Sequence, residues 1–134
     1  MIQLRVFTPD DYPMVSSWWE AANWPPVPQE ALSPLGMVAY SEKEQLAVGW
    51  VYMVTQYWAI IEWLVVNPQA SMKSRKLAVE SRVERLVKEA KGFGAKVIFG
   101  YLKAPGLIRL YKRHGFQVTD IGMTHLVYKI GETK

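Results

Sequence analysis

Between Tyr57 and Tyr101 the chain reads as a strand, a long helix and a second strand, and this order decides what kind of sheet it can form. Tyr57–Val66 is rich in valine, isoleucine and aromatic residues, which predicts a strand. The pattern is helical from about Met72 to Lys91, and Lys96–Tyr101 again resembles a strand. Because a helix of this length allows its flanking strands to run parallel, the sequence predicts a sheet with at least one parallel pair.

The long helix has an apolar stripe with spacings of three and four residues, which is the pattern of one buried face. The stripe consists of Val79, Val83, Leu86, Val87 and Ala90. Charged residues are expected to cover the opposite, solvent-exposed face. These are Glu80, Arg82, Glu84, Arg85 and Lys88.

The flanking segments predict a mixed sheet of about seven strands in an α+β (α/β) fold. Thr8, Pro9 and Asp11 form a capping pattern that begins the first helix, which ends near Ala22. The expected order is β-α-β-β-β-α-β-α-β-β, with a short helical turn after the first helix. The other expected elements are strands Ile2–Phe7, Gly36–Tyr40, Gln45–Val54, Phe116–Thr119 and Thr124–Ile130, the turn Gln29–Leu32, and a helix from Pro105 to Gly115.

Composition excludes several classes of protein. The chain has 134 residues, which suits one domain spanning 1–134, and half of them are hydrophobic. The absence of cysteine excludes disulfides, cysteine–zinc sites and a thiol nucleophile. The longest apolar run, Trp58–Val66, is interrupted by Glu62 and is too short to cross a bilayer. The N-terminus lacks the pattern of a signal peptide, so a cytoplasmic protein without membrane contact is expected.

The positive charge is concentrated in the second half of the chain. Between Lys73 and Arg113 there are twelve Lys or Arg and three Glu, whereas the remainder holds four basic and nine acidic residues. A basic segment of this kind indicates either a polyanionic ligand or a solvated helix face. The cluster of Lys73, Arg75 and Lys76 at the start of the long helix is the part that most favours a ligand.

Three segments carry a resemblance to the GNAT superfamily of acyl-CoA N-acyltransferases. Ile60–Pro68 resembles the family's fourth strand, in which an acidic residue precedes a Val-x-Pro ending. The long helix follows directly, and Pro105–Phe116 resembles the family's segment with Leu-Tyr and Gly-Phe. Gly122–Val127 is similar to small bacteriophage-encoded members. The resemblance implies helices on both faces of the sheet, acetyl-CoA as cosubstrate and an amine acceptor.

The same resemblance implies a site for coenzyme A along the end of the fourth strand and the tip of the long helix. Val65 and Val66 would offer main-chain groups to the pantetheine arm. The helix tip would hold the diphosphate through free N–H groups and basic side chains, although the glycines usual in this loop are absent. This degenerate diphosphate segment consists of Ser71, Lys73, Ser74, Arg75 and Lys76. A solvated charge cluster is the alternative interpretation.

Acetyl transfer requires a base for the amine and an acid for the leaving thiolate. The resemblance places Glu62 as the base, and an apolar strand around it would raise its pKa. The alternative is a solvent-facing glutamate. Tyr111 is placed as the acid, and the alternative is a tyrosine that packs beside Phe116.

Several aromatic and histidine residues have simpler interpretations. Trp24 could form an aromatic wall for an acceptor, or could hold the proline-rich loop in place, while Trp18 and Trp19 are expected in the core. His114 and His125 have no partners at metal-ligand spacing, so they are read as structural or surface residues and no metal is expected.

The sequence therefore predicts an N-acetyltransferase in which the amine attacks acetyl-CoA directly in a ternary complex, because no cysteine nucleophile exists. One alternative is a GNAT-like protein that binds coenzyme A or a partner without turnover. Another is a phage-type protein that modifies nucleic acid, although the sequence contains no groove-binding motif. A homodimer would be common for this fold.

Overall fold

The computed structural model describes residues 1–124, 126, 128, 130 and 131. Within them the chain forms a five-stranded sheet in the order β1-β2-β3-β4-β5. The strands are β1 (Gln3–Val6), β2 (Gly36–Tyr40), β3 (Gln45–Met53), β4 (Trp58–Val66) and β5 (Val97–Gly100). The helices are α1 (Tyr12–Ala21), α2 (Met72–Gly92) and α3 (Pro105–Arg113), with short 3₁₀ turns at Pro9–Asp11 and Gln29–Ala31.

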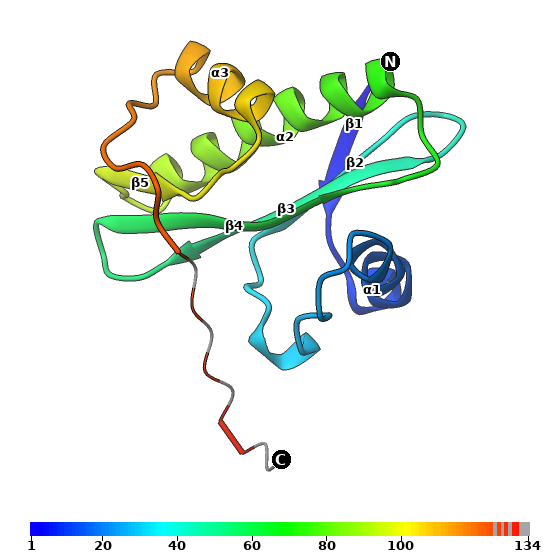
Figure 1. Ribbon diagram of the computed structural model, residues 1–134, viewed down its shortest axis with the longest axis horizontal. Coiled ribbons are helices and arrows are strands. Elements are labelled where there is room, and N and C mark those ends of the chain that lie inside the picture. The colour runs from blue at the N-terminus through cyan, green and yellow to red at the C-terminus, as the bar shows by residue number, and fades with distance from the viewer. Residues whose placement is uncertain (125, 127, 129, 132–134) are drawn as a thin grey trace.

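The predicted mixed sheet is confirmed, and so are the helices on both faces. Strands β1 to β4 pair antiparallel, whereas β4 and β5 pair parallel through the crossover helix α2. Helices α2 and α3 lie over one face of the sheet and α1 lies over the other (Figure 1). The two faces are called the α2 face and the α1 face below.

The start of the first helical segment follows the capping pattern in the sequence. The Thr8 amide donates to Asp11 Oδ2 at 2.9 Å. Arg5 of β1 holds the same carboxylate with two hydrogen bonds of 2.7 and 2.8 Å. These Arg5 hydrogen bonds lower the pKa of Asp11 and attach the helix start to the edge strand.

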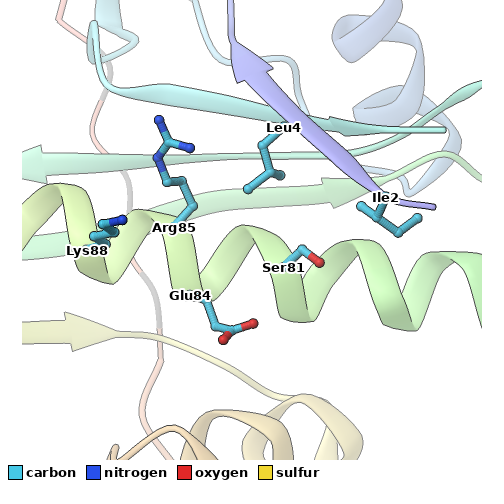
Figure 2. A pocket seen from close by; sticks show the side chains of 6 residues that line it. All are labelled: Ile2, Leu4, Ser81, Glu84, Arg85 and Lys88. Atoms are coloured by element: carbon cyan, nitrogen blue, oxygen red, sulfur yellow. The ribbon is translucent and has the colours of Figure 1, made fainter.

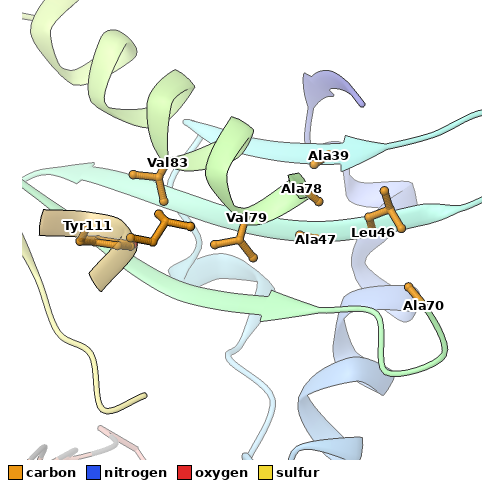
Figure 3. Close-up of a cluster of buried hydrophobic side chains, with 9 residues drawn as sticks. Ala39, Leu46, Ala47, Ala70, Ala78, Val79, Val83 and Tyr111 are labelled. Atoms are coloured by element: carbon orange, nitrogen blue, oxygen red, sulfur yellow. The ribbon is translucent and has the colours of Figure 1, made fainter. Parts of the chain in front are cut away.

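Alternate residues of the central strands bury their side chains against opposite helices, as the period of two in a strand requires. On the α2 face, Ala47 packs in a cluster with residues of α2 and α3, drawn in Figure 3. On the α1 face, Val48 and Trp50 pack against Val15, Trp18 and Trp19. Trp19 and Trp50 are fully buried, with ring centroids 5.7 Å apart. The expectation that Trp18 and Trp19 belong to the core is therefore confirmed.

The pairing of β3 with β4 is interrupted by one extra residue in β4. Val48 pairs with Val65, but Trp50 pairs with Glu62, so three steps along β4 match two steps along β3. Trp63 within this bulge has φ +62°, a left-handed conformation that is uncommon for a bulky residue. After the bulge, each side chain of β4 lies on the face opposite to the one that strict alternation from the start of the strand would give it.

Arg82 is the clearest correction to the sequence analysis. The charge pattern predicts it on the solvent face of the long helix, but its side chain is only 1% exposed. It lies three residues after Val79 and four before Leu86, so it belongs to the buried stripe. The guanidinium reaches the sheet at the bulge, where Nη1 donates to the Val48 carbonyl at 2.7 Å.

The seven-strand expectation is also corrected. Phe116–Thr119 is expected to be a strand but has no strand conformation, so the predicted order holds only as far as α3. For Thr124–Ile130, positions 125, 127 and 129 lie outside the described residues. No helix in the described part of the chain is long and apolar enough to span a membrane.

Gly36 is expected to tolerate no side chain. A Cβ there would lie 2.5 Å from Trp50 Nε1 and 2.7 Å from Trp50 Cδ1, both in a fully buried ring. Gly36→Ala should therefore lower the free energy of unfolding by about 1–3 kcal/mol, measured by urea denaturation. Gly92→Ala is the matched control, because a Cβ at that position would meet no atom within 4 Å. Equal stability of the two variants would contradict the packing at Trp50.

Candidate functional site

The site begins where β4 and β5 part. Their parallel pairing runs only from Trp58 with Val97 to Ile61 with Gly100. Strand β4 then continues to Val66 with β3 on one side only, while the chain after Gly100 leaves toward α3. The stretch of β4 after Ile61 thus has no β5 partner among the described residues, and this unpaired stretch between the two strands is called the opening below.

The peptide groups of the two valines predicted to offer main-chain hydrogen bonds point to opposite edges of β4. The amide of Asn67 donates to Leu46 of β3, and the carbonyl of Val65 lies 3.4 Å from Arg82 Nη1. Peptide groups alternate in direction along a strand, so those of Val66 point to the opening. Val66 is therefore available to a ligand chain, whereas the carbonyl of Val65 is engaged inside the protein.

Glu62 lies on the α1 face at a hollow of about 260 Å³ beside the bulge. The hollow is lined by Tyr52, Val54, Ile60, Glu62 and Trp63. The bulge places Trp63 with Glu62 on this face, while Ile61 and Leu64 pack toward α2. Burial raises the pKa of the Tyr52 hydroxyl, and the nearby Glu62 carboxylate adds to the rise. The carboxylate is therefore held at the wall of an otherwise apolar and aromatic hollow.

Tyr111 of α3 is brought to the same opening from the α2 face. Its side chain is 3% exposed, and a Cβ on Gly100 would lie 3.1 Å from its Cε2 atom. The ring also packs on Phe116 with centroids 4.8 Å apart, so the packing interpretation of Tyr111 is correct as far as the ring is concerned. Its hydroxyl is buried and has no hydrogen-bond partner among the described residues.

The electrostatics of the opening keep this hydroxyl protonated. Burial raises the pKa of Tyr111 to about 12, against a lowering by Arg82, and the Glu62 carboxylate adds to the rise. The Glu62 carboxylate therefore influences the pKa of Tyr111, although the two side chains lie on opposite faces of β4. The pair combines a carboxylate that can accept a proton with a buried phenol that can donate one.

The tip of α2 follows β4 directly, as predicted. Ser71 is the N-cap, and its Oγ accepts a hydrogen bond from the Ser74 amide at 3.1 Å. One amide of the predicted diphosphate segment is thus already satisfied. Lys73 and Lys76 are exposed and Arg75 is partly exposed, so their charges can reach a ligand.

The remaining candidates lie away from this opening. Trp24 is 46% exposed in the loop after α1 and does not line the Glu62 hollow. His114 Nε2 lies 3.1 Å from Glu80 Oε2 and links α3 to α2, in agreement with its structural interpretation. His125 is outside the described residues. Among the residues that are described, no three His, Asp or Glu side chains gather as a metal site.

A larger hollow of about 300 Å³ lies at the other edge of the sheet, between β1 and α2 (Figure 2). It is lined by Ile2, Leu4, Ser81, Glu84, Arg85 and Lys88. No residue predicted for catalysis or cofactor binding lines it, and β1 is separated from the opening by the width of the sheet. Size alone therefore does not identify the site.

At the level of sequence, no family model and no curated protein matches the chain. Solved structures do match in fold. The ribosomal-protein-S18-alanine N-acetyltransferase from Escherichia coli has a TM-score of 0.72 at 17% identity, covering 90% of this chain and 80% of that one. A putative acetyltransferase, yncA from Salmonella typhimurium, solved with acetyl-CoA, has a TM-score of 0.73 at 18% identity, covering 92% and 86%. Ard1 from Thermoplasma volcanium has 0.71 at 16%, covering 89% and 84%.

Tyr111 should give the protein a specific loss of stability at alkaline pH. Below pH 10 the Tyr111 phenol is protonated in both the folded and the unfolded protein. Above pH 10 it ionises first in the unfolded chain, because its pKa in the folded protein is about 12. The free energy of unfolding should therefore fall between pH 10 and 12 by about 2 kcal/mol more in the wild type than in Tyr111→Phe. Urea denaturation across this range measures the difference, and Tyr57→Phe, at a half-exposed position, is the control. Parallel curves for wild type and Tyr111→Phe would refute the buried, protonated state.

Proposed function

We propose that this chain, which has the GNAT fold, transfers an acetyl group from acetyl-CoA to a primary amine by direct attack in a ternary complex. The observation that carries the proposal is the placement of two groups: Glu62 at the hollow on the α1 face, and the buried Tyr111 hydroxyl, without a partner among the described residues, beside Gly100, where the pairing of β4 with β5 ends. One supplies a proton acceptor and the other a proton donor. Acyl transfer to an amine needs the proton acceptor for the amine and the proton donor for the leaving thiolate.

The opening between β4 and β5 fits the acyl-pantetheine arm of coenzyme A. A ligand amide chain can hydrogen-bond the free peptide groups at Val66 like an added strand. The tip of α2 follows immediately, and Lys73, Arg75 and Lys76 can neutralise the phosphates there. The structure of yncA with acetyl-CoA supports the same cosubstrate for this chain.

The acceptor side is the hollow at Glu62. A protonated amine is attracted by the carboxylate, and Tyr52 and Trp63 offer aromatic surface to the group that carries it. The carboxylate then accepts a proton from the amine, which frees the nitrogen lone pair for attack on the thioester carbonyl. The apolar lining favours an amine on an aliphatic or aromatic group over an amine surrounded by charges.

Tyr111 acts at the leaving group. Because its pKa is raised to about 12, the hydroxyl carries its proton at neutral pH, and it has no internal acceptor among the described residues. It can therefore give that proton to the coenzyme A sulfur as the carbon–sulfur bond breaks.

A protein that binds coenzyme A or a partner without turnover remains the second candidate, and the Ser71 cap favours it. The cap occupies the Ser74 amide at 3.1 Å, in a segment with no glycine to bring the backbone close to a diphosphate. Binding then depends on the basic side chains, and a weakly held cosubstrate would limit turnover.

The basic side chains at the tip of α2 should contribute to binding only where the ligand has phosphates. Replacing Lys73, Arg75 and Lys76 together by alanine should raise the Kd for coenzyme A at least about tenfold and leave the Kd for pantetheine unchanged. Isothermal calorimetry measures both. Alanine at Lys43, Lys88 and Lys91 removes the same charge elsewhere and is the control. An equal loss for coenzyme A in both triple variants would show a general charge effect and refute the site.

Catalysis should depend on both proton-transfer groups. Glu62→Gln should lower kcat about 10²-fold or more, and Tyr111→Phe about 10-fold or more, with coenzyme A affinity retained. Release of free thiol from acetyl-CoA measures the rate with a panel of aliphatic, aromatic and acidic amines. Glu84→Gln, exposed on α2, is the control for loss of a carboxylate. Coenzyme A binding with no thiol release from any amine would favour the binding protein over the enzyme.

A further inference from the structure

Arg82 is a buried positive charge without a negative partner among the described residues. Its side chain is 1% exposed, and the ion pairs found in this part of the chain are formed by Arg5, Arg85, Arg113 and His114 instead. Only Nη1 has acceptors there, the carbonyls of Val48 and Val65 at 2.7 and 3.4 Å. The Nε group is buried and has no acceptor within the same residues.

Such a residue is costly to the fold. Burial lowers the pKa of Arg82 to about 10, because the charged form is desolvated. Buried ions can often be replaced by apolar side chains of similar volume without loss of stability. Stability alone therefore does not explain why an arginine occupies a stripe that is otherwise apolar.

The fold makes room for this side chain. A Cβ at Gly49 would lie 3.0 Å from both Cδ and Nε of Arg82, so the absence of a side chain at this buried strand position leaves room for the arginine against β3. The arginine reaches the bulge at the point where β3 and β4 lose register. The charge is thus directed at the same stretch of β4 that carries Glu62.

Arg82 and Tyr111 belong to the same packed region, because Tyr111 shares a buried cluster with Val79 and Val83, which flank Arg82 on α2. Both side chains border the α2 face of the sheet, and each affects the ionisation of the other electrostatically. Two buried polar atoms of these side chains, Arg82 Nε and Tyr111 Oη, lack partners within the described chain. Arg82 reaches Val65, in the stretch of β4 without a β5 partner, and Tyr111 lies beside Gly100, where the pairing ends. A group that becomes negative during the reaction would satisfy this arrangement.

We propose that Arg82 is a positioning residue for leaving-group protonation, whose buried charge stabilises the negative charge left on Tyr111 when its hydroxyl proton has gone to the thiolate. This inference rests on the proposed function. Before the step, Glu62 has passed the ammonium proton to solvent. The neutral amine nitrogen then bonds to the carbonyl carbon and gives its second proton to Glu62. The carbon–sulfur bond breaks with its electron pair on sulfur, and sulfur takes the proton of Tyr111. Solvent then takes the proton from Glu62 and returns one to the phenolate that Arg82 has stabilised.

The first test measures the ionisation of Tyr111 without any substrate. In protein labelled with ¹³C at the tyrosine ring, the signal lost in Tyr111→Phe identifies the residue, and its pKa is followed in each variant. Arg82→Met should raise the pKa of Tyr111 by about one unit or more, whereas Arg82→Lys should keep it near the wild-type value. Arg85→Met, which removes a half-exposed arginine one turn away on α2, should leave it unchanged.

The second test is a double-mutant cycle in kcat. Arg82→Met should slow thiol release about tenfold in the wild-type background and hardly at all in Tyr111→Phe, because the arginine acts through the tyrosine. Arg82→Lys should restore most of the rate. Thermal unfolding of every variant shows whether the fold is retained, and Arg82→Gln replaces Arg82→Met if the methionine variant does not fold.

The outcomes separate this inference from the proposed function. An unchanged pKa of Tyr111 in the folded Arg82→Met protein, or additive effects on kcat, would overturn the role of Arg82 even in an active enzyme. A wild-type protein that releases no thiol, yet shows the shift of Tyr111, would overturn the acetyltransferase and retain the electrostatic coupling. Both the shift and the non-additive cycle together support the inference.

Discussion

One extra residue in β4 shapes both the sheet and the candidate site. The bulge at Trp63 lets Glu62 and Trp63 share the α1 face while Leu64 returns to the α2 face. Just before it, at Ile61, the pairing with β5 ends, so the strand that continues to Val66 has a free edge within the described chain. Arg82 binds the Val48 carbonyl at this point and replaces part of the interrupted ladder. Without the bulge, Glu62 and Trp63 would lie on opposite faces.

The polar groups at the opening are arranged at a cost to stability. Among the described residues, the Tyr111 phenol has no hydrogen-bond partner and the Arg82 guanidinium has no carboxylate, although polar groups in protein interiors are normally hydrogen-bonded. Elsewhere the protein satisfies its charges well, as in the bidentate pair of Arg5 with Asp11. The indole nitrogens of Trp19, Trp50 and Trp58 also lack a partner among the described residues, but of these five side chains only those of Arg82 and Tyr111 are ionisable. Ionisable groups with shifted pKa values, as both of these have, cluster at functional sites.

Much of the fold could be predicted from local pattern. The first eight helices and strands occur in the expected order because hydrophobic period, prolines and glycines are local signals. Glu62 and Tyr111 could be proposed only through resemblance, and nothing local in the sequence shows that they lie on either side of one strand. The burial of Arg82 is not predicted when the charge of its side chain is given more weight than its position in the apolar stripe. Its place between Val79 and Leu86 in the stripe is the signal that could have found it.

The sequence by itself determined the order of elements as far as α3, the mixed sheet and the basic segment after β4, since each depends on spacing along the chain. Only the tertiary structure decided where β4 and β5 part, which face Trp63 occupies, and that a tyrosine from α3 and an arginine from α2 are buried on the face opposite to Glu62. These features depend on register and burial. Both arise when distant segments pack together, and a single extra residue in one strand is enough to change them.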